Sequence, residues 1–190
     1  DQSRNAVAFA RRMADAGAAA VTVHGRTRAQ GYAGQADWSA IAEVVAAVPV
    51  PVVGNGDVVD GASARALFEQ TGCAGIMIGR AATGAPWIFK NVHRYLATGE
   101  LAGEPPPHER GGIALRHFEY MLELYGEHMA CLHIRRIACA YARGLRGARE
   151  FRGHIVHVTS ADDARAAIRA FFFSPDRTYQ SDPRDHANHV

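Results

Sequence analysis

The chain has 190 residues, of which 48% are hydrophobic and 21% charged, and its formal net charge is +2 at pH 7. This balance is typical of a globular protein with a hydrophobic core and excludes disordered and fibrous chains. The small net charge says nothing about nucleic acid by itself, and no apolar run reaches the roughly 18 residues of a membrane span.

Helical and strand patterns alternate over residues 1–98. Ser3 is the expected cap of a first helix over residues 3–16. Short runs of mostly β-branched or apolar residues predict strands at 20–24, 50–54 and 75–79. Helices are expected at 38–47 after a cap at Asp37, from Asp60 to the residue before Gly72, and after Pro86.

This repeated strand-loop-helix order predicts an α/β unit with a parallel sheet. Three strands cannot close a barrel, because a (β/α)8 barrel typically needs ~250 residues. We therefore expect residues 1–98 to be the last βα units of a TIM barrel whose first strands are absent, in a chain that begins inside a longer protein.

The second half of the chain changes character. Residues 99–108 contain Pro105–Pro107 and predict a linker. Residues 109–173 predict a small all-α helical bundle domain, with helices at 109–125, 130–145 and 162–173, the last capped by Ser160. Residues 174–190 are polar and predict a flexible tail.

Three unusual motifs follow the three predicted strands. His24–Arg28 places a histidine and two arginines around a glycine, and Gly54–Asp57 is a turn whose main-chain N–H groups could bind a phosphate or a ring edge. Gly79–Gly84 precedes a helix and resembles the phosphate loops of barrel enzymes. Each motif alone also fits an ordinary polar loop, but their order is far more specific than any one of them.

That order resembles the tRNA-dihydrouridine synthases, closest to their bacterial B-type branch. The resemblance runs from Asn5 to about Phe172. It rests on stretches at the strand ends, after the third strand and in the helical region: 21–28, 53–57, 77–82, 84–89, 134–136 and 147–152.

The resemblance implies an FMN cofactor and a tRNA substrate. The residues that match FMN-binding positions are His24, Asn55, Gly56, Asp57, Gly79 and Arg80. The candidates for tRNA contacts are Arg26, Arg28, Arg135 and Arg136, with Arg26 also considered for the FMN phosphate. Phosphate contacts of this kind position a nucleic acid without reading its sequence.

The family relationship also implies an oxidoreductase that acts on a CH–CH group in the cytoplasm. NADPH reduces the flavin, hydride passes to C6 of a uracil drawn out of its stack, and a cysteine protonates C5. We expect that cysteine in the absent part of the barrel, so no catalytic residue is assigned in this chain.

The chain's own three cysteines do not fill this role. Cys73 is expected at the opposite face from the flavin, and Cys131 and Cys139 are expected to pack as small core residues. No CxxC pair is present, so neither a disulfide framework nor a metal site is predicted, and a reducing compartment fits best. We expect the full-length protein to be a monomer.

Two alternatives stay open at this point. Another FMN-binding TIM-barrel oxidoreductase, such as a dihydroorotate-dehydrogenase-like enzyme, would share the phosphate loop but would not predict a basic helical domain. An inactive truncated fragment that binds tRNA weakly, or binds nothing, would also carry these motifs.

Overall fold

The computed structural model describes residues 4–176, 178 and 179. The described chain divides into two compact units, the first within residues 1–82 and 87–102 and the second within residues 83–86 and 103–189. Ser3 and most of the expected tail at 174–190 lie outside the described residues. The first helix begins at Ala6 after Asn5, three residues beyond Ser3, so the expected cap at Ser3 is wrong. The assignment of these regions as separate functional domains stays a prediction.

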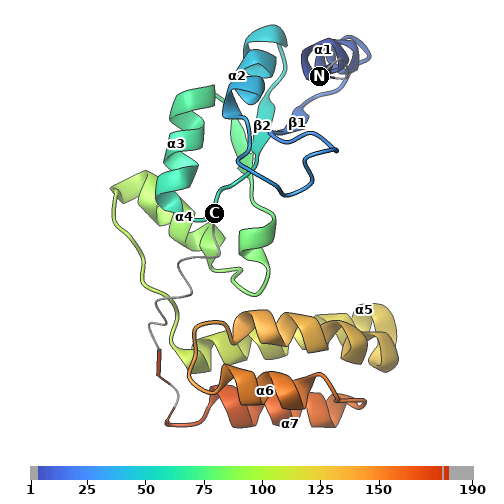
Figure 1. The fold of residues 1–190 in the computed structure, drawn as a ribbon, viewed down its shortest axis with the longest axis vertical. Coiled ribbons are helices and arrows are strands. Elements are labelled where there is room, and N and C mark those ends of the chain that lie inside the picture. The colour runs from blue at the N-terminus through green and yellow to red at the C-terminus, as the bar shows by residue number, and fades with distance from the viewer. Residues whose placement is uncertain (1–3, 177, 180–190) are drawn as a thin grey trace. The chain divides into compact units, whose positions relative to one another are not determined.

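The first unit repeats strand and helix in sequence order (Figure 1). Its elements are α1 (Ala6–Asp15), β1 (Val21–His24), α2 (Trp38–Ala47), β2 (Val52–Asn55), α3 (Gly61–Thr71), β3 (Gly75–Met77), the 3-10 helix η1 (Arg80–Ala82) and α4 (Ile88–Thr98). The three strands are parallel and lie in the order β1-β2-β3, with Val21 opposite Val52 and Val53 opposite Gly75. The predicted α/β organisation with a small parallel sheet is confirmed.

Side-chain caps fix the starts of two of these helices. The Asp37 carboxylate accepts a hydrogen bond from the Ala40 N–H before α2. Asp60 accepts from the Ser63 N–H at 2.7 Å, and the Ser63 hydroxyl accepts from the Asp60 N–H in return, which makes a capping box. Both caps were expected, and α3 ends at Gly72 in the left-handed conformation, with φ 66°.

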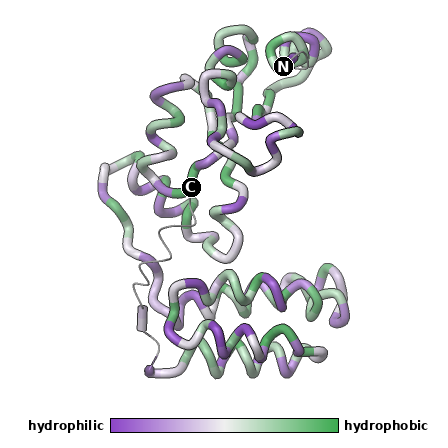
Figure 2. Tube along the Cα trace, viewed as in Figure 1, coloured by the Kyte–Doolittle hydropathy of each residue, from purple (hydrophilic) through white to green (hydrophobic). Residues whose placement is uncertain are grey.

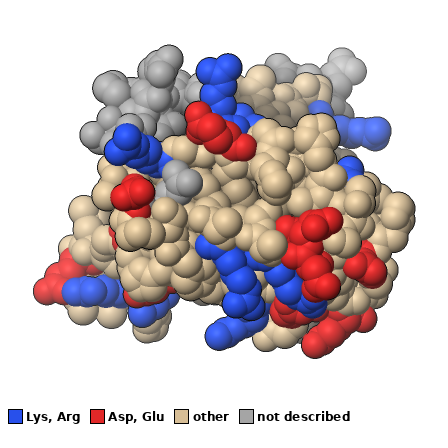
Figure 3. All heavy atoms as spheres, turned by 90° about the horizontal axis from the view of Figure 1, so that it is seen from below, with Lys and Arg blue, Asp and Glu red and all other residues tan. Residues whose placement is uncertain are grey.

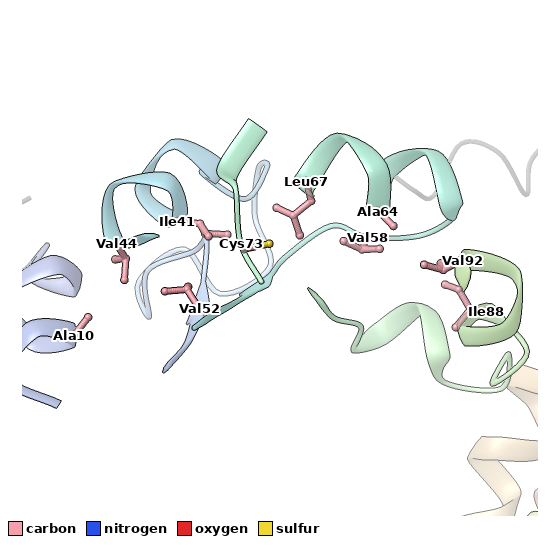
Figure 4. Packing of buried hydrophobic residues seen from close by; sticks show 10 residues of the cluster. All are labelled: Ala10, Ile41, Val44, Val52, Val58, Ala64, Leu67, Cys73, Ile88 and Val92. Carbon is pink, nitrogen blue, oxygen red and sulfur yellow. The ribbon is translucent and has the colours of Figure 1, made fainter. Parts of the chain in front are cut away.

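The hydrophobic core of the first unit lies between the sheet and its helices (Figure 4). Ile41 of α2 and Leu67 of α3 are completely buried there, and Trp38 packs against the same cluster. Trp87 is also buried, as expected for a core residue. Because successive side chains of a strand alternate between faces, only every second strand residue joins this core.

The other face of the sheet is open. Thr22 and His24 of β1 are exposed, and the Met77 side chain of β3 is 51% exposed. Parallel sheets are normally covered on both faces, so this face is the one that further strands or another layer would cover in a complete fold.

The second unit consists of helices that pack on one another: α5 (Pro107–Tyr141), α6 (Ala148–Ile155) and α7 (Ala161–Phe172). α5 is broken at Gly126, whose φ of 73° and ψ of 168° are not helical. The expected break between residues 125 and 130 is therefore confirmed. Green and purple stretches alternate along these helices in Figure 2, as amphipathic helices require.

Aromatic contacts tie α6 to α7. The ring centroids of Phe151 and Phe171 lie 4.3 Å apart and stacked, and Phe172 meets both rings edge-on. Ser160 caps α7 by accepting from the Asp163 N–H, as expected.

One element was predicted wrongly. No helix was expected between residues 145 and 162, but Ala148–Ile155 form α6, with Phe151 and Ile155 buried. Its signals are a first-turn acidic residue, Glu150, and basic residues in the last turn, an order that suits the helix dipole. The strands also differ by one or two residues from the expected ranges, and α4 begins two residues after Pro86.

Within the described residues, no helix is both long enough and apolar enough to cross a bilayer.

Candidate functional site

The carboxyl ends of the three parallel strands meet at one edge of the sheet. His24, the last residue of β1, lies opposite Asn55, the last residue of β2, and Asn55 lies opposite Met77 at the end of β3. Ligand sites of parallel α/β folds lie beyond this edge, on the loops that leave the strands. The structure therefore brings the first two predicted motifs together.

Hydrogen bonds link the polar residues at these ends. His24 Nδ1 lies 3.1 Å from the Asn55 carbonyl oxygen, and Asn55 Nδ2 donates to the Met77 carbonyl at 2.6 Å. A carbonyl oxygen only accepts, so His24 Nδ1 is the donor in this bond, which leaves Nε2 for another partner. By the same logic, the Asn55 amide presents its oxygen to other groups.

The turn Asn55–Asp57 has an unusual backbone. Gly56 has φ 137° and Asp57 has φ 58°, a left-handed value that costs a non-glycine residue on the order of 1 kcal/mol. A Cβ on Gly56 would lie 2.6 Å from the Ala36 Cβ, so only glycine fits there. Trp38 Nε1 donates to the Gly56 carbonyl at 3.0 Å and fixes the turn from the core side.

The Asp57 carboxylate is the centre of a charged network. Its Oδ1 accepts from Arg26 Nη1 at 2.7 Å and from Arg80 Nη2 at 3.1 Å. Its Oδ2 accepts from Arg26 Nη2 at 2.8 Å and from the Ala36 N–H at 2.7 Å. Burial raises the pKa of Asp57, but the bonds from Arg26 and Ala36 and the charges of Arg26 and Arg80 outweigh it, and the pKa is held below its ordinary value.

Arg26 lies inside the protein. Its side chain is 3% exposed, and besides Asp57 it donates to the carbonyls of Ala33 at 3.3 Å and Gly34 at 2.6 Å. This position does not support the expectation that Arg26 contacts a tRNA or FMN phosphate directly, because such a contact would require these bonds to break. Arg28, two residues on, is exposed and stays a candidate for a tRNA contact.

The third motif adds an exposed cation. Arg80 opens η1 directly after Gly79, and its side chain is 56% exposed. Its guanidinium lies 4.6 Å from the centroid of the Tyr32 ring, and Tyr32 is 72% exposed on the loop after β1. Sequence reasoning missed Tyr32, although an aromatic residue flanked by Gly31 and Gly34 in a polar loop is a usable signal.

The residues at this rim fit an anionic group such as the FMN phosphate. Nothing lies within 4 Å of the position where a Cβ on Gly79 would stand, so the main chain there is open to a ligand. Among the described residues, the N–H groups of Gly56 and Gly79 donate to no main-chain carbonyl outside the regular elements. Arg80 supplies a positive charge beside them and uses one nitrogen on Asp57.

In the second unit, too, one candidate arginine is bonded within the protein and the other is exposed. Arg135 donates through Nε and Nη2 to the Val158 carbonyl at 3.1 and 2.8 Å, which fixes the segment after α6. Arg136 is exposed and stays a candidate for a phosphate contact. On the face shown in Figure 3, acidic and basic side chains are interspersed, so no single-sign field is visible there.

The cysteines do not form a reactive site. Cys73 is buried on the helix side of the sheet, where a Cβ on Gly54 would lie 3.2 Å from its Sγ. Burial raises the pKa of both the Cys131 and the Cys139 thiol. Raised pKa values disfavour the reactive thiolate. Within the described part of the chain, no group of three His, Cys, Asp or Glu side chains is placed to hold a metal ion.

Comparison with known proteins gives a consistent result. A family model described as dihydrouridine synthase (Dus) matches residues 1–174. The chain is 41% identical over 170 residues to tRNA-dihydrouridine synthase B of Pseudomonas aeruginosa, an alignment that covers 90% of this chain and 51% of that protein.

Two further relatives agree. A probable tRNA-dihydrouridine synthase of Rickettsia conorii is 36% identical over 174 residues, covering 92% of this chain and 53% of the relative. One of Rhodobacter capsulatus is 39% identical over 168 residues, covering 88% and 51%. The chain thus spans about half the length of the curated relatives it matches.

Proposed function

This chain belongs to the dihydrouridine synthase family, and from that premise we propose that it is the C-terminal part of an FMN-dependent tRNA-dihydrouridine synthase. In this proposal the first unit supplies the last strands of a TIM barrel and the second unit is a helical domain that binds tRNA. The missing strands would come from the half of the relatives' length that this chain does not span.

One observation carries the proposal. His24, Asn55 and Arg80 lie at or just after the three strand ends on one edge of the sheet, and Asp57, on the loop after β2, bonds to Arg26 and Arg80 on the other two loops. That arrangement suits an extended ligand with one anionic end. FMN, with a flavin ring and a phosphate, is such a ligand.

Each residue has a distinct role toward FMN. Arg80 and the open main chain at Gly79 would bind the phosphate, and the Asn55–Gly56 segment would bind through its amide and N–H groups. His24 would present Nε2 toward the cofactor from the open face of the sheet. When bound, FMN supplies the hydride chemistry, taking hydride from NADPH and delivering it to C6 of a uracil.

The reduction of uridine also needs a proton at C5. Since Cys73 is buried on the helix side of the sheet, we propose that the proton donor is a cysteine in the part of the protein outside this chain. Arg28 and Arg136 are the exposed members of the expected tRNA set, so they are the candidates for phosphate contacts. We propose a monomer that acts in the cytoplasm.

Family membership weakens the first alternative. A different FMN barrel enzyme would not require the match to continue through the helices to residue 174, as it does. The second alternative, an inactive fragment, describes this chain without its missing strands. It does not compete with the proposal for the full-length protein.

The direct test uses the full-length protein encoded with this chain. We expect it to purify with a flavin absorption spectrum and to convert uridine to dihydrouridine in tRNA when NADPH is supplied, measured by mass spectrometry of the digested tRNA. A folded, full-length protein without flavin and without this activity would contradict the proposal.

Arg80→Ala tests the phosphate contact. Loss of one charge-assisted contact should weaken FMN binding about tenfold or more, measured by flavin fluorescence. Arg94→Ala is the matched control, because Arg94 is 53% exposed and also pairs with a carboxylate, Glu100, but stands on α4 and not on a loop that follows a strand. Equal FMN affinity in the two variants would remove the phosphate role from Arg80.

A further inference from the structure

Arg26 and Asp57 form an ion pair that uses nearly all of its donors and acceptors within the protein. We infer that both are positioning residues: they lock the loop at residues 25–36 onto the Asn55–Asp57 turn, and the ligand is bound by the main chain of that turn and not by these two side chains. The inference rests on the proposed function for its ligand, FMN, but the lock itself is a property of this chain.

The Arg26 guanidinium has little capacity to spare for a phosphate. Nε donates to Ala33, Nη1 to Asp57, and Nη2 to both Gly34 and Asp57, so four of its five N–H groups have partners. The side chain is 3% exposed. Its partners lie on two segments, the loop after β1 and the turn after β2, so Arg26 joins them directly.

The Asp57 carboxylate is equally occupied. A carboxylate offers about four acceptor positions. Arg26 takes two of them, the Ala36 N–H takes one and Arg80 takes one. A ligand hydroxyl would have to displace one of these donors, whereas the main-chain N–H groups of the turn need no such displacement.

The backbone explains why such a lock is useful. Asp57 is held at φ 58°, and Gly56, at φ 137°, packs against Ala36 from the locked loop. Strained backbone persists where surrounding contacts over-determine it. Releasing the loop would free the turn to relax and would lose the arrangement of its N–H groups.

Charge supports the same division of roles. Two guanidinium groups share one carboxylate, so the network keeps one net positive charge. The buried Arg26 is neutralised by its bidentate pair with Asp57, and the exposed Arg80 makes the single, longer contact of 3.1 Å. The free charge is therefore on Arg80, where a phosphate can reach it.

The experiment compares Arg26→Ala, Asp57→Ala and the double variant in the full-length flavin-bound protein. We expect each single variant to bind FMN about tenfold more weakly. The double variant should lose no more FMN affinity than the single variant with the larger loss, because both substitutions remove the same lock. Trypsin should also cleave after Arg28 several-fold faster in each variant, since the loop is released.

Arg26→Lys covers the case in which an alanine variant fails to fold. Lysine keeps the charge and most of the stem but cannot make the bidentate contact. We expect faster cleavage after Arg28 than in the wild type with the thermal unfolding temperature of the rest of the protein nearly unchanged.

Three results would overturn the inference. If the loss of FMN affinity in the double variant equals the product of the two single losses, each side chain contacts the cofactor separately. Unchanged FMN affinity in Arg26→Ala, with a tRNA salt slope reduced by about one, would make Arg26 a phosphate ligand. Unchanged cleavage after Arg28 in all variants would show that the pair does not hold the loop. The cleavage measurement needs no flavin, so it shows whether the pair holds the loop even if the wild-type protein binds no FMN.

Discussion

Arg26 and Arg110 are almost completely removed from solvent, with side chains 3% and 6% exposed. Arg110 donates to the carbonyls of Tyr141 and Arg143, pairs with Glu104 at 2.7 Å and contacts the Tyr179 hydroxyl. Both arginines therefore bridge a carboxylate and main-chain carbonyls from distant segments. The planar fork of five donors makes arginine, unlike lysine, suited to this.

The half-buried position of His117 on α5 predicts a pH-dependent stability. Burial lowers the pKa of His117, whose Nδ1 lies 3.3 Å from the Tyr141 hydroxyl, and burial raises the pKa of Tyr141 to about 12. The tyrosine is thus neutral at all ordinary pH values. In this pair, His117 is therefore the group that gains charge when the solution is acidified.

The sign follows from proton binding. The unfolded histidine titrates near pH 6.5, whereas the folded one titrates lower, so the unfolded state binds more protons just below that pH. We expect the free energy of unfolding, measured by urea titration, to fall as pH drops from 7 to 5. His117→Asn should flatten this slope, and an equally steep slope in that variant would assign it to other groups.

At the scale of elements, α5 packs tightly against the end of α7 at a glycine. A Cβ on Gly111 would lie 2.5 Å from the Phe172 Cβ and 2.9 Å from the Phe173 Cε2. The next residue, Gly112, is exposed on the same helix, and a Cβ there would meet nothing within 4 Å. The two positions therefore differ in packing but share helix and residue type.

Substituting each of these two glycines by alanine gives a prediction and its control. Gly111→Ala should destabilise the protein by about 1–3 kcal/mol, because it overpacks a close contact. Gly112→Ala should stabilise it by about 0.5–1 kcal/mol, because alanine favours the helix and meets no obstacle. The midpoints of urea unfolding measure both, and a destabilising Gly112→Ala would contradict this account of α5.

Sequence periodicity was sufficient for most elements. The caps Asp37, Asp60 and Ser160 were found because capping is local and chemically specific. Helix α6 was missed because it is 8 residues long and its arginines masked two buried apolar positions. Strand ends moved by one or two residues because tertiary pairing, not local preference, decides where a ladder stops.

The candidate site was predicted only in part, because local motifs can be read from the sequence and tertiary pairing cannot. Its residue types and order could be recognised, since each motif is contiguous. The pairing of Arg26 with Asp57, which are 31 residues apart, could not. Nothing in the sequence distinguishes this buried arginine from the exposed Arg28 nearby. Only the fold shows which of the two is already occupied.

At the scale of the whole molecule, the main feature to explain is the face of the sheet that no helix covers. The helices cover one face, while Thr22 and His24 are exposed on the other and Met77 is 51% exposed. In the proposed barrel this face would turn inward and be covered by side chains of the missing strands. The same residue would then be exposed in this chain and buried in the full-length protein.

Thr22→Glu turns that difference into a measurement. Thr22 lies in the middle of β1, opposite Val53, and away from the strand ends that would bind FMN. In the 190-residue chain the substitution should change the free energy of unfolding by less than about 0.5 kcal/mol, as for other surface positions. In the full-length protein it would bury an unpaired carboxylate and should cost more than about 3 kcal/mol. Urea unfolding of both proteins, each with and without the substitution, gives the comparison. Equal costs in the two would mean that the preceding sequence does not cover this face, and the barrel proposal would fail even if the family membership stands.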